Sequence, residues 1–257
     1  MLLAALLLAA ARAAVVQAPI CADRPAKGNA VCTVPAGSFQ VETGLADWTL
    51  AKQSGTRSEF VSLGSTVLKY GLSDRSDVEL GFTPYARASV RDGAGRSHAA
   101  GVGDVVVRFK HQLTGSSAKL QAALLPFVKI PTAASGLGNG QVEAGLAVPM
   151  SFALIGSATM TLGPELDWLV DGDGHGRHLA LVNLANLSLP IAPRVTAAAE
   201  LWSNFNFDPA ATLNQASADA ALAYAVSNDA QLDAGANFGL TRDTPDVELY
   251  AGASLRF

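Results

Sequence analysis

The C-terminal segment from Pro245 to Phe257 alternates between apolar and polar side chains with a period of two. The apolar parity comprises Val247, Leu249, Ala251, Ala253, Leu255 and Phe257. This alternation predicts a β-strand with one apolar face and one polar face. The apolar face continues to Phe257 at the end of the chain, which suits a strand whose outer face contacts lipid.

Segments with the same alternation recur from Ser38 onward, separated by clusters of turn-forming residues. The predicted strands are residues 39–50, 59–70, 77–90, 104–113, 119–130, 141–152, 157–170, 178–189, 195–207, 215–226, 231–241 and 245–257. The repetition predicts an all-β fold, a 12-stranded antiparallel up-and-down transmembrane β-barrel. The alternation leaves the facing of the first, second and eighth strands open. In the second strand, either a bulge or a shorter strand would explain the break.

The connections between these segments alternate in length. The even-numbered ones are short, at residues 71–76, 114–118, 153–156, 190–194 and 227–230, whereas several odd-numbered ones are longer, notably 91–103, 131–140 and 208–214. Outer-membrane barrels have short periplasmic turns and long extracellular loops. An even number of strands therefore places the C-terminus on the periplasmic side.

Charged side chains occupy the parity that faces the predicted lumen. The candidate lumen-lining residues are Glu79, Tyr85, Arg87, Arg108, Lys110, Lys129, Glu143, Glu165, Asp167, Glu200, Trp202, Asp233, Glu248 and Arg256. Most of these charges can form cross-strand ion pairs that satisfy the interior of the barrel. Some could instead line a solute path, with Tyr85 and Trp202 offering aromatic surface. Twelve strands imply a lumen narrower than that of the open porins.

Composition agrees with apolar side chains distributed by alternation. Mean hydropathy is +0.26, yet beyond the N-terminus no apolar run is long enough for a membrane-spanning helix. The net charge of −4 and the absence of a basic patch in the sequence argue against nucleic acid as a partner.

The N-terminus divides into two further regions. Residues 1–13 are predicted to be a signal peptide, because a Leu- and Ala-rich run leads to the cleavage-like sequence Ala11-Arg12-Ala13. Residues 14–37 form a periplasmic segment before the barrel of residues 38–257. Cys21 and Cys32 are predicted to form a disulfide near the periplasmic mouth, stabilising by about 3 kcal/mol. A metal pair is the alternative, but the sequence supplies no further ligands nearby.

Residues that could support catalysis are few. The loop from Asp171 to His178 has alternating carboxylates and two His, but an exposed Gly-rich loop is the favoured interpretation. We predict no cofactor, no metal and no catalytic residues. A surface hydrolase stays open as an alternative, with His111 on the outward parity near a periplasmic end. A structural or adhesive barrel is the other alternative.

The whole mature chain resembles the family of outer-membrane transporters of the phenol-degradation meta pathway. The resemblance is carried by Cys21-Ala22-Asp23-Arg24-Pro25, Cys32-Thr33-Val34-Pro35-Ala36-Gly37, Lys69-Tyr70-Gly71-Leu72-Ser73-Asp74-Arg75, Gly103-Asp104-Val105, Pro131-Thr132 with Gly136-Leu137-Gly138, Asn237-Phe238-Gly239-Leu240 and Thr244-Pro245-Asp246-Val247-Glu248-Leu249-Tyr250. It implies a non-enzymatic channel in the cell outer membrane for small hydrophobic or aromatic solutes. The C-terminal strand ending in Phe257 resembles the signal recognised by the barrel assembly machinery. Outer-membrane lipid, that machinery and the solute are the expected partners.

Overall fold

The structure, a computed structural model, describes residues 18–257, and the regular secondary structure of this part of the chain is β-strand. The strand segments are β1 (Phe39–Gln53), β2 (Thr56–Ser73), β3 (Ser76–Phe82), β4 (Tyr85–Asp92), β5 (Gly95–Gly101), β6 (Val105–Gln112), β7 (Leu120–Ile130), β8 (Glu143–Ala147), β9 (Met150–Ala153), β10 (Thr159–Leu162), β11 (Glu165–Val170), β12 (Arg177–Ala192), β13 (Val195–Asn206), β14 (Leu213–Ala225), β15 (Ala230–Gly239) and β16 (Val247–Arg256). No helix within residues 18–257 is long and apolar enough to cross a membrane.

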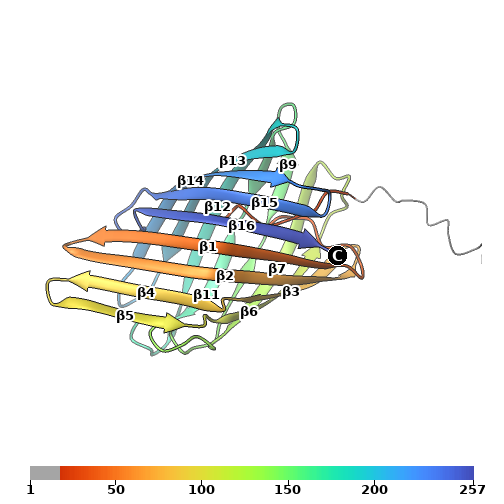
Figure 1. Cartoon of the computed structure of the whole chain (residues 1–257). Helices are drawn as coiled ribbons and strands as arrows, with labels where there is room; N and C mark the ends of the chain where they lie inside the picture. Colours follow the sequence, from red (N-terminus) through yellow and green to blue (C-terminus); the bar gives the residue numbers. More distant parts are fainter. Residues whose placement is uncertain (1–17) are drawn as a thin grey trace, which may run out of the picture.

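The strands form one closed barrel (Figure 1). β1 pairs with both β2 and β16, so the sheet has no free edge there. Four barrel strands are interrupted and consist of β3 with β4, β5 with β6, β8 with β9, and β10 with β11. The barrel therefore has twelve antiparallel strands, which confirms the predicted fold class.

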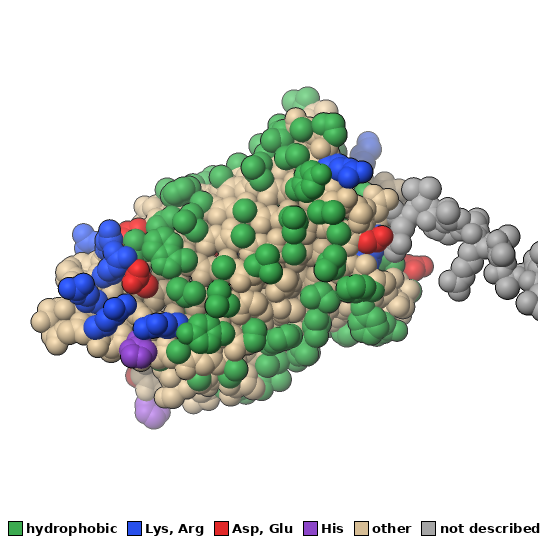
Figure 2. Space-filling model, in the orientation of Figure 1, with side chains coloured by type: hydrophobic (Ala, Val, Ile, Leu, Met, Phe, Trp, Pro, Cys, Tyr) green, Lys and Arg blue, Asp and Glu red, His purple; other side chains and the backbone are tan. Residues whose placement is uncertain are grey.

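The surface of the barrel is inverted relative to that of a soluble protein. Leu201, Leu222 and Leu249 are 61%, 53% and 48% exposed, whereas Lys69 and Lys110 are 2% and 1% exposed. Apolar side chains spread over the outer wall, and charged ones lie toward its two ends (Figure 2). Aromatic side chains also occupy the outer face, including Phe39, Trp48, Tyr70, Tyr85, Phe109 and Trp168. An apolar band of this kind faces lipid, so the barrel spans a membrane.

The two ends of the barrel differ. The short turns near Ser73, Arg194 and Asn228 lie at the end that holds the C-terminus, while the β1–β2 and β4–β5 hairpins extend at the opposite end (Figure 1). The predicted long loop at residues 91–103 is wrong, because residues 95–101 form β5, paired with β4. This strand lies beyond the apolar band, where backbone pairing continues without any need for one face to be apolar.

A line of irregularities crosses the first three barrel strands and inverts their alternation. Leu45 is the extra residue where the register between β1 and β16 shifts. In β2, Gly64 has a φ of 70°, and the hydroxyls of Ser62 and Ser65 are 3.1 Å apart, so these residues share the inner face. The break between β3 and β4 at Thr83 and Pro84 lies beside them. The break in the second strand is thus a bulge, not a shortening.

This inversion corrects two predicted lumen residues. Ala86 pairs with the inward Ser62 and is 2% exposed, whereas Tyr85 pairs with Leu63, and both of these are exposed. Arg87 is also exposed and has the same parity as Tyr85. Tyr85 and Arg87 therefore lie on the outer face rather than in the lumen.

The facing of β12 is also resolved by the structure. Asn186 is 5% exposed and donates a hydrogen bond to Glu200 at 3.0 Å inside the barrel. Asn183 has the opposite parity and pairs with Ser203 on the outer face. The sequence was ambiguous here because one of the two amides faces outward in an otherwise apolar row.

The N-terminal segment, residues 18–38, lies inside the barrel at the end where the short turns are. We call it the plug. The sequence predicted a segment near the periplasmic mouth, and the structure inserts it into the lumen, where Arg24 and Lys27 reach barrel strands. The predicted signal peptide at residues 1–13 lies outside the described residues.

Candidate functional site: a plugged lumen

Asp23 of the plug is the centre of a buried cluster of charges. Its carboxylate contacts the ammonium of Lys69, and its Oδ1 lies 2.9 Å from Lys110 Nζ. Glu42 also contacts Lys69, and Glu79 Oε1 lies 3.1 Å from Lys110 Nζ. Buried charges persist only when they are paired, and the carboxylate of the plug adds to the pairing that Glu42 and Glu79 give the two barrel lysines.

The backbone of the plug adds to this cluster. Glu42 accepts hydrogen bonds from the backbone N–H groups of Asp23 and Arg24, at 2.9 and 3.1 Å. Asp77 accepts a hydrogen bond from the backbone N–H of Val34 at 2.8 Å. Burial alone would raise the pKa of Asp23, but the ammonium groups of Lys110 and Lys69 hold it well below its usual value.

Two cations of the plug face the opposite wall. Arg24 forms an ion pair with Asp233 at 2.8 Å. Lys27 Nζ donates to Ser217 Oγ at 2.9 Å, lies 3.6 Å from Asp219 and sits 4.7 Å from the centre of the Trp202 ring. The plug thus bridges strands from both halves of the chain.

The plug is also cross-linked within itself and held to the barrel by its backbone. Cys21 and Cys32 form the predicted disulfide, with their Cα atoms 6.1 Å apart. Gly37 N–H donates to Gly71 O at 2.8 Å. A Cβ on Gly71 would lie 2.0 Å from Pro35 O, so only glycine permits this close approach.

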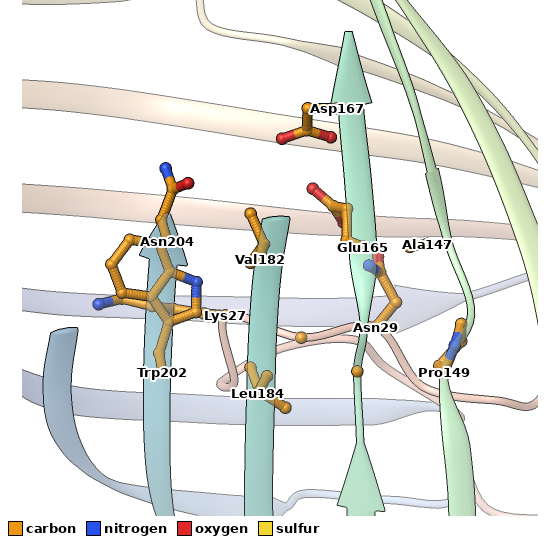
Figure 3. A pocket seen from close by; sticks show the side chains of 12 residues that line it. Lys27, Asn29, Ala147, Pro149, Glu165, Asp167, Val182, Leu184, Trp202 and Asn204 are labelled. Atoms are coloured by element: carbon orange, nitrogen blue, oxygen red, sulfur yellow. The ribbon is translucent and has the colours of Figure 1, made fainter. Parts of the chain in front are cut away.

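Two neighbouring cavities remain beside the plug. The first has a volume of about 250 Å³ and is lined by Lys27, Gly28, Asn29, Ala147, Pro149, Gly163, Glu165, Asp167, Val182, Leu184, Trp202 and Asn204 (Figure 3). The second, also about 250 Å³, shares Asn29, Glu165 and Asp167 with it. Both are small for a membrane channel, and plug residues line each of them.

The first cavity combines apolar and polar surface. Trp202 on β13, Val182 and Leu184 on β12, and Glu165 and Asp167 on β11 lie side by side on three neighbouring strands (Figure 3). The plug residues Lys27, Gly28 and Asn29 also line the cavity. A ring beside aliphatic side chains can bind an aromatic solute, and the few polar groups can orient it.

The predicted lumen residues fall into three groups. Arg108, Lys129, Glu143, Glu165, Asp167 and Trp202 line the cavities. A second group contacts the plug or lies close to its charged side chains, and it comprises Glu79, Lys110, Glu200, Asp233 and Glu248. Arg256 pairs with Asp229 at the rim. Tyr85 and Arg87 are on the outer face.

Sequence reasoning missed the plug residues that complete the site. Asp23, Arg24, Lys27 and Asn29 lie outside any alternating segment, so no parity marked them as inward. Their signal was the presence of charges in a segment held by two cysteines. Some of their partners are far away in the chain, as in the contact between Arg24 and Asp233, which are 209 positions apart.

Two other side-chain groupings appear. Asp171, His178 and Asp208 have ligand atoms within 4.8 Å of one another. Internal contacts engage all three of them, since His178 Nδ1 lies 2.8 Å from Asp171 and Gly172 N–H donates to Asp208. These contacts join loops at the extracellular end.

The second grouping is a Ser–His pair that the sequence did not indicate. Ser76 Oγ lies 2.8 Å from His111 Nδ1, and the two residues are cross-strand partners on β3 and β6. Their parity is that of the exposed Val78 and Phe109, so the pair faces outward.

Comparisons with known proteins agree with this architecture. An outer membrane channel from Pseudomonas putida F1 matches with a TM-score of 0.67 and 16% identity, over 88% of this chain and 98% of that one. The NanC porin matches with a TM-score of 0.54 and 10% identity, over 84% of this chain and 98% of that one. A search of curated proteins gives no match.

The closed barrel, its lipid-facing outer wall and its charged interior define the class as an outer-membrane β-barrel with the fold of channel proteins. More specifically, residues 22–257 match the family described as "Putative MetA-pathway of phenol degradation", and the chain belongs to this family.

Proposed function

We propose that this barrel passes small, largely apolar or aromatic solutes through the outer membrane. The observation that carries the proposal is the plugged lumen, in which Trp202, Val182 and Leu184 line a narrow cavity beside the plug. An apolar cavity of about 150 Å³ is enough to bind benzene, so a cavity of about 250 Å³ accommodates one substituted ring. The family description, which refers to phenol degradation, supports the same solute class.

Proteoliposome uptake tests the proposal. Benzenesulfonate and phenyltrimethylammonium keep a benzene ring but are too polar to cross lipid unaided, and arabinose serves as a non-aromatic solute. We expect faster uptake of the ring compounds than of arabinose. Uptake of all three at equal rates, or of none, would contradict the proposal.

Two aromatic substitutions provide a matched comparison. Trp202→Ala removes the ring from the cavity and should slow uptake of the ring compounds by about threefold, the value of one aromatic contact. Tyr85→Ala removes a ring from the outer face and should leave uptake unchanged. Equal effects of the two substitutions would mean that the solute does not pass Trp202.

A second candidate function is hydrolysis of a membrane ester. It is favoured by one observation, the Ser76–His111 pair on the outer wall, because a serine is activated as a nucleophile by an adjacent histidine. Ester hydrolysis by the same proteoliposomes, abolished in Ser76→Ala, would support it. Hydrolysis that survives Ser76→Ala would exclude this pair.

A further inference from the structure

The register of the extracellular hairpins places four cations in one row across four strand segments. Lys52 on β1 pairs with Arg57 on β2, Arg57 pairs with Arg91 on β4, and Arg91 pairs with Arg96 on β5. Residues directly opposite in antiparallel strands point to the same side of the sheet. We call this set the basic row, and all four members are exposed.

The basic row faces outward. Arg57 and Arg91 have the parity of Val61 and Arg87, which pair with each other on the outer face, and Val61 also pairs with Trp48. Lys and Arg side chains gather on the outer surface at the end where the β1–β2 and β4–β5 hairpins turn (Figure 2). The sequence did not show this patch because its members are distributed over two hairpins.

Like charges directly opposite one another are destabilising unless an anion lies between them. Among residues 18–257, ion pairing to the basic row comes from Glu59, which contacts Arg57 at 2.7 Å. Asp246 accepts from the backbone N–H of Lys52, and Asp92 accepts from N–H groups in the β4–β5 turn. Glu59 also interacts electrostatically with Arg96, so one carboxylate serves a row of four cations. Arg91 and Arg96 therefore lie next to each other with most of their positive charge available to an external anion.

The height of the basic row above the apolar band identifies the anion. Trp48 lies four residues from Lys52 along β1, which is about 13 Å along the strand and about 10 Å along the membrane normal at the tilt of such strands. An aromatic residue of this kind marks the edge of the hydrocarbon, so the row lies at the level of lipid headgroups. Guanidinium groups bind phosphate through paired N–H donors.

We infer that the basic row binds the phosphate groups of lipid A, the phosphorylated lipid of the outer leaflet, and so holds this side of the barrel to its surrounding lipid. The site is independent of the lumen and of any solute that passes through it. Arg91 and Arg96 would contact phosphate directly, and Arg87, at the height of Trp48, extends the patch toward the membrane.

Native mass spectrometry of the whole barrel in detergent, without divalent cations, tests this inference. Diphosphoryl lipid A and dephosphorylated lipid A are titrated in parallel, and the wild type should bind the phosphorylated form more tightly. Arg91→Gln with Arg96→Gln should weaken that binding by about 30-fold, which is about fivefold for each cation near a charged lipid surface. The matched control, Lys119→Gln with Arg242→Gln, removes two exposed cations elsewhere and should leave it unchanged.

The migration of boiled and unboiled samples on a gel verifies that each variant is folded. Equal affinity of the wild type for the two lipids would overturn the inference, and this comparison needs no variant. Unchanged binding in the folded Arg91→Gln and Arg96→Gln protein, or an equal loss in the control, would also overturn it.

Discussion

Asp23 Oδ1 lies 2.9 Å from Lys110 Nζ, although the two residues are 87 positions apart in the chain. The contact joins a segment without regular structure to the end of barrel strand β6. Because Lys110 is 1% exposed, it needs this partner when the plug is in place. The charge cluster of Asp23, Lys69 and Lys110 thus holds the plug to the barrel wall, and we call it the latch.

Asp23→Asn should weaken this latch. The change keeps the shape of the side chain but removes the negative charge that lies beside Lys69 and Lys110. We expect the docked plug to be destabilised by about 3 kcal/mol. This value is at the lower end of the range for breaking a buried ion pair, because Glu42 and Glu79 still contact the two lysines. Trypsin cleavage after Lys27, which requires an undocked plug, should then become about 100-fold faster. Asp74→Asn, in an exposed turn, is the control and should not change the rate.

Acid should release the same latch. The pKa of Asp23 is lowered in the docked state, so the carboxylate stabilises the docked plug. This stabilisation is fully present above the ordinary pKa of about 3.9, and it is lost as the pH falls through the lowered pKa of the docked state. Bilayer conductance should therefore stay low from neutral pH to about pH 4 and rise below it. In Asp23→Asn this rise should be absent or much smaller, whereas an identical pH profile in both proteins would assign the transition to another group.

The disulfide should restrict how far the plug can unfold. Cys21→Ser with Cys32→Ser removes the cross-link, which in the chain-entropy model destabilises the closed loop by about 3 kcal/mol. The barrel strands do not depend on it, so gel migration before boiling should be retained. Hydrogen exchange of residues 22–31 should accelerate, and unchanged exchange would show that the ionic contacts alone keep the plug ordered.

The sequence predicted the barrel well because lipid on one side and charges on the other impose a strict period of two. The prediction failed where that constraint is absent or locally broken. Beyond the apolar band, β5 pairs without an amphipathic pattern, so the sequence predicted a loop at residues 91–103. At Leu45, Gly64 and Pro84, one extra residue per strand reverses the faces, which moved Tyr85 and Arg87 out of the predicted lumen.

The candidate site was only half predictable for a different reason. Its wall residues, such as Trp202 and Glu165, carry the parity of a strand, and the alternation placed them inward. Its plug residues carry no such pattern, since their position depends on ion pairs with distant strands. The contact between Ser76 and His111 was also unpredictable, because it depends on the register between two strands and no local motif encodes that register.

The most direct test of the central claim, that the plug closes the lumen, is single-channel conductance with and without it. A chain beginning at Ala14 and a chain beginning at Ser38 are refolded and compared in planar bilayers at neutral pH. Without the plug, Lys69 and Lys110 would face water in an open lumen, and conductance should rise several-fold, with arabinose passing as readily as the ring compounds. Equal conductance and unchanged solute preference in the two proteins would contradict the account.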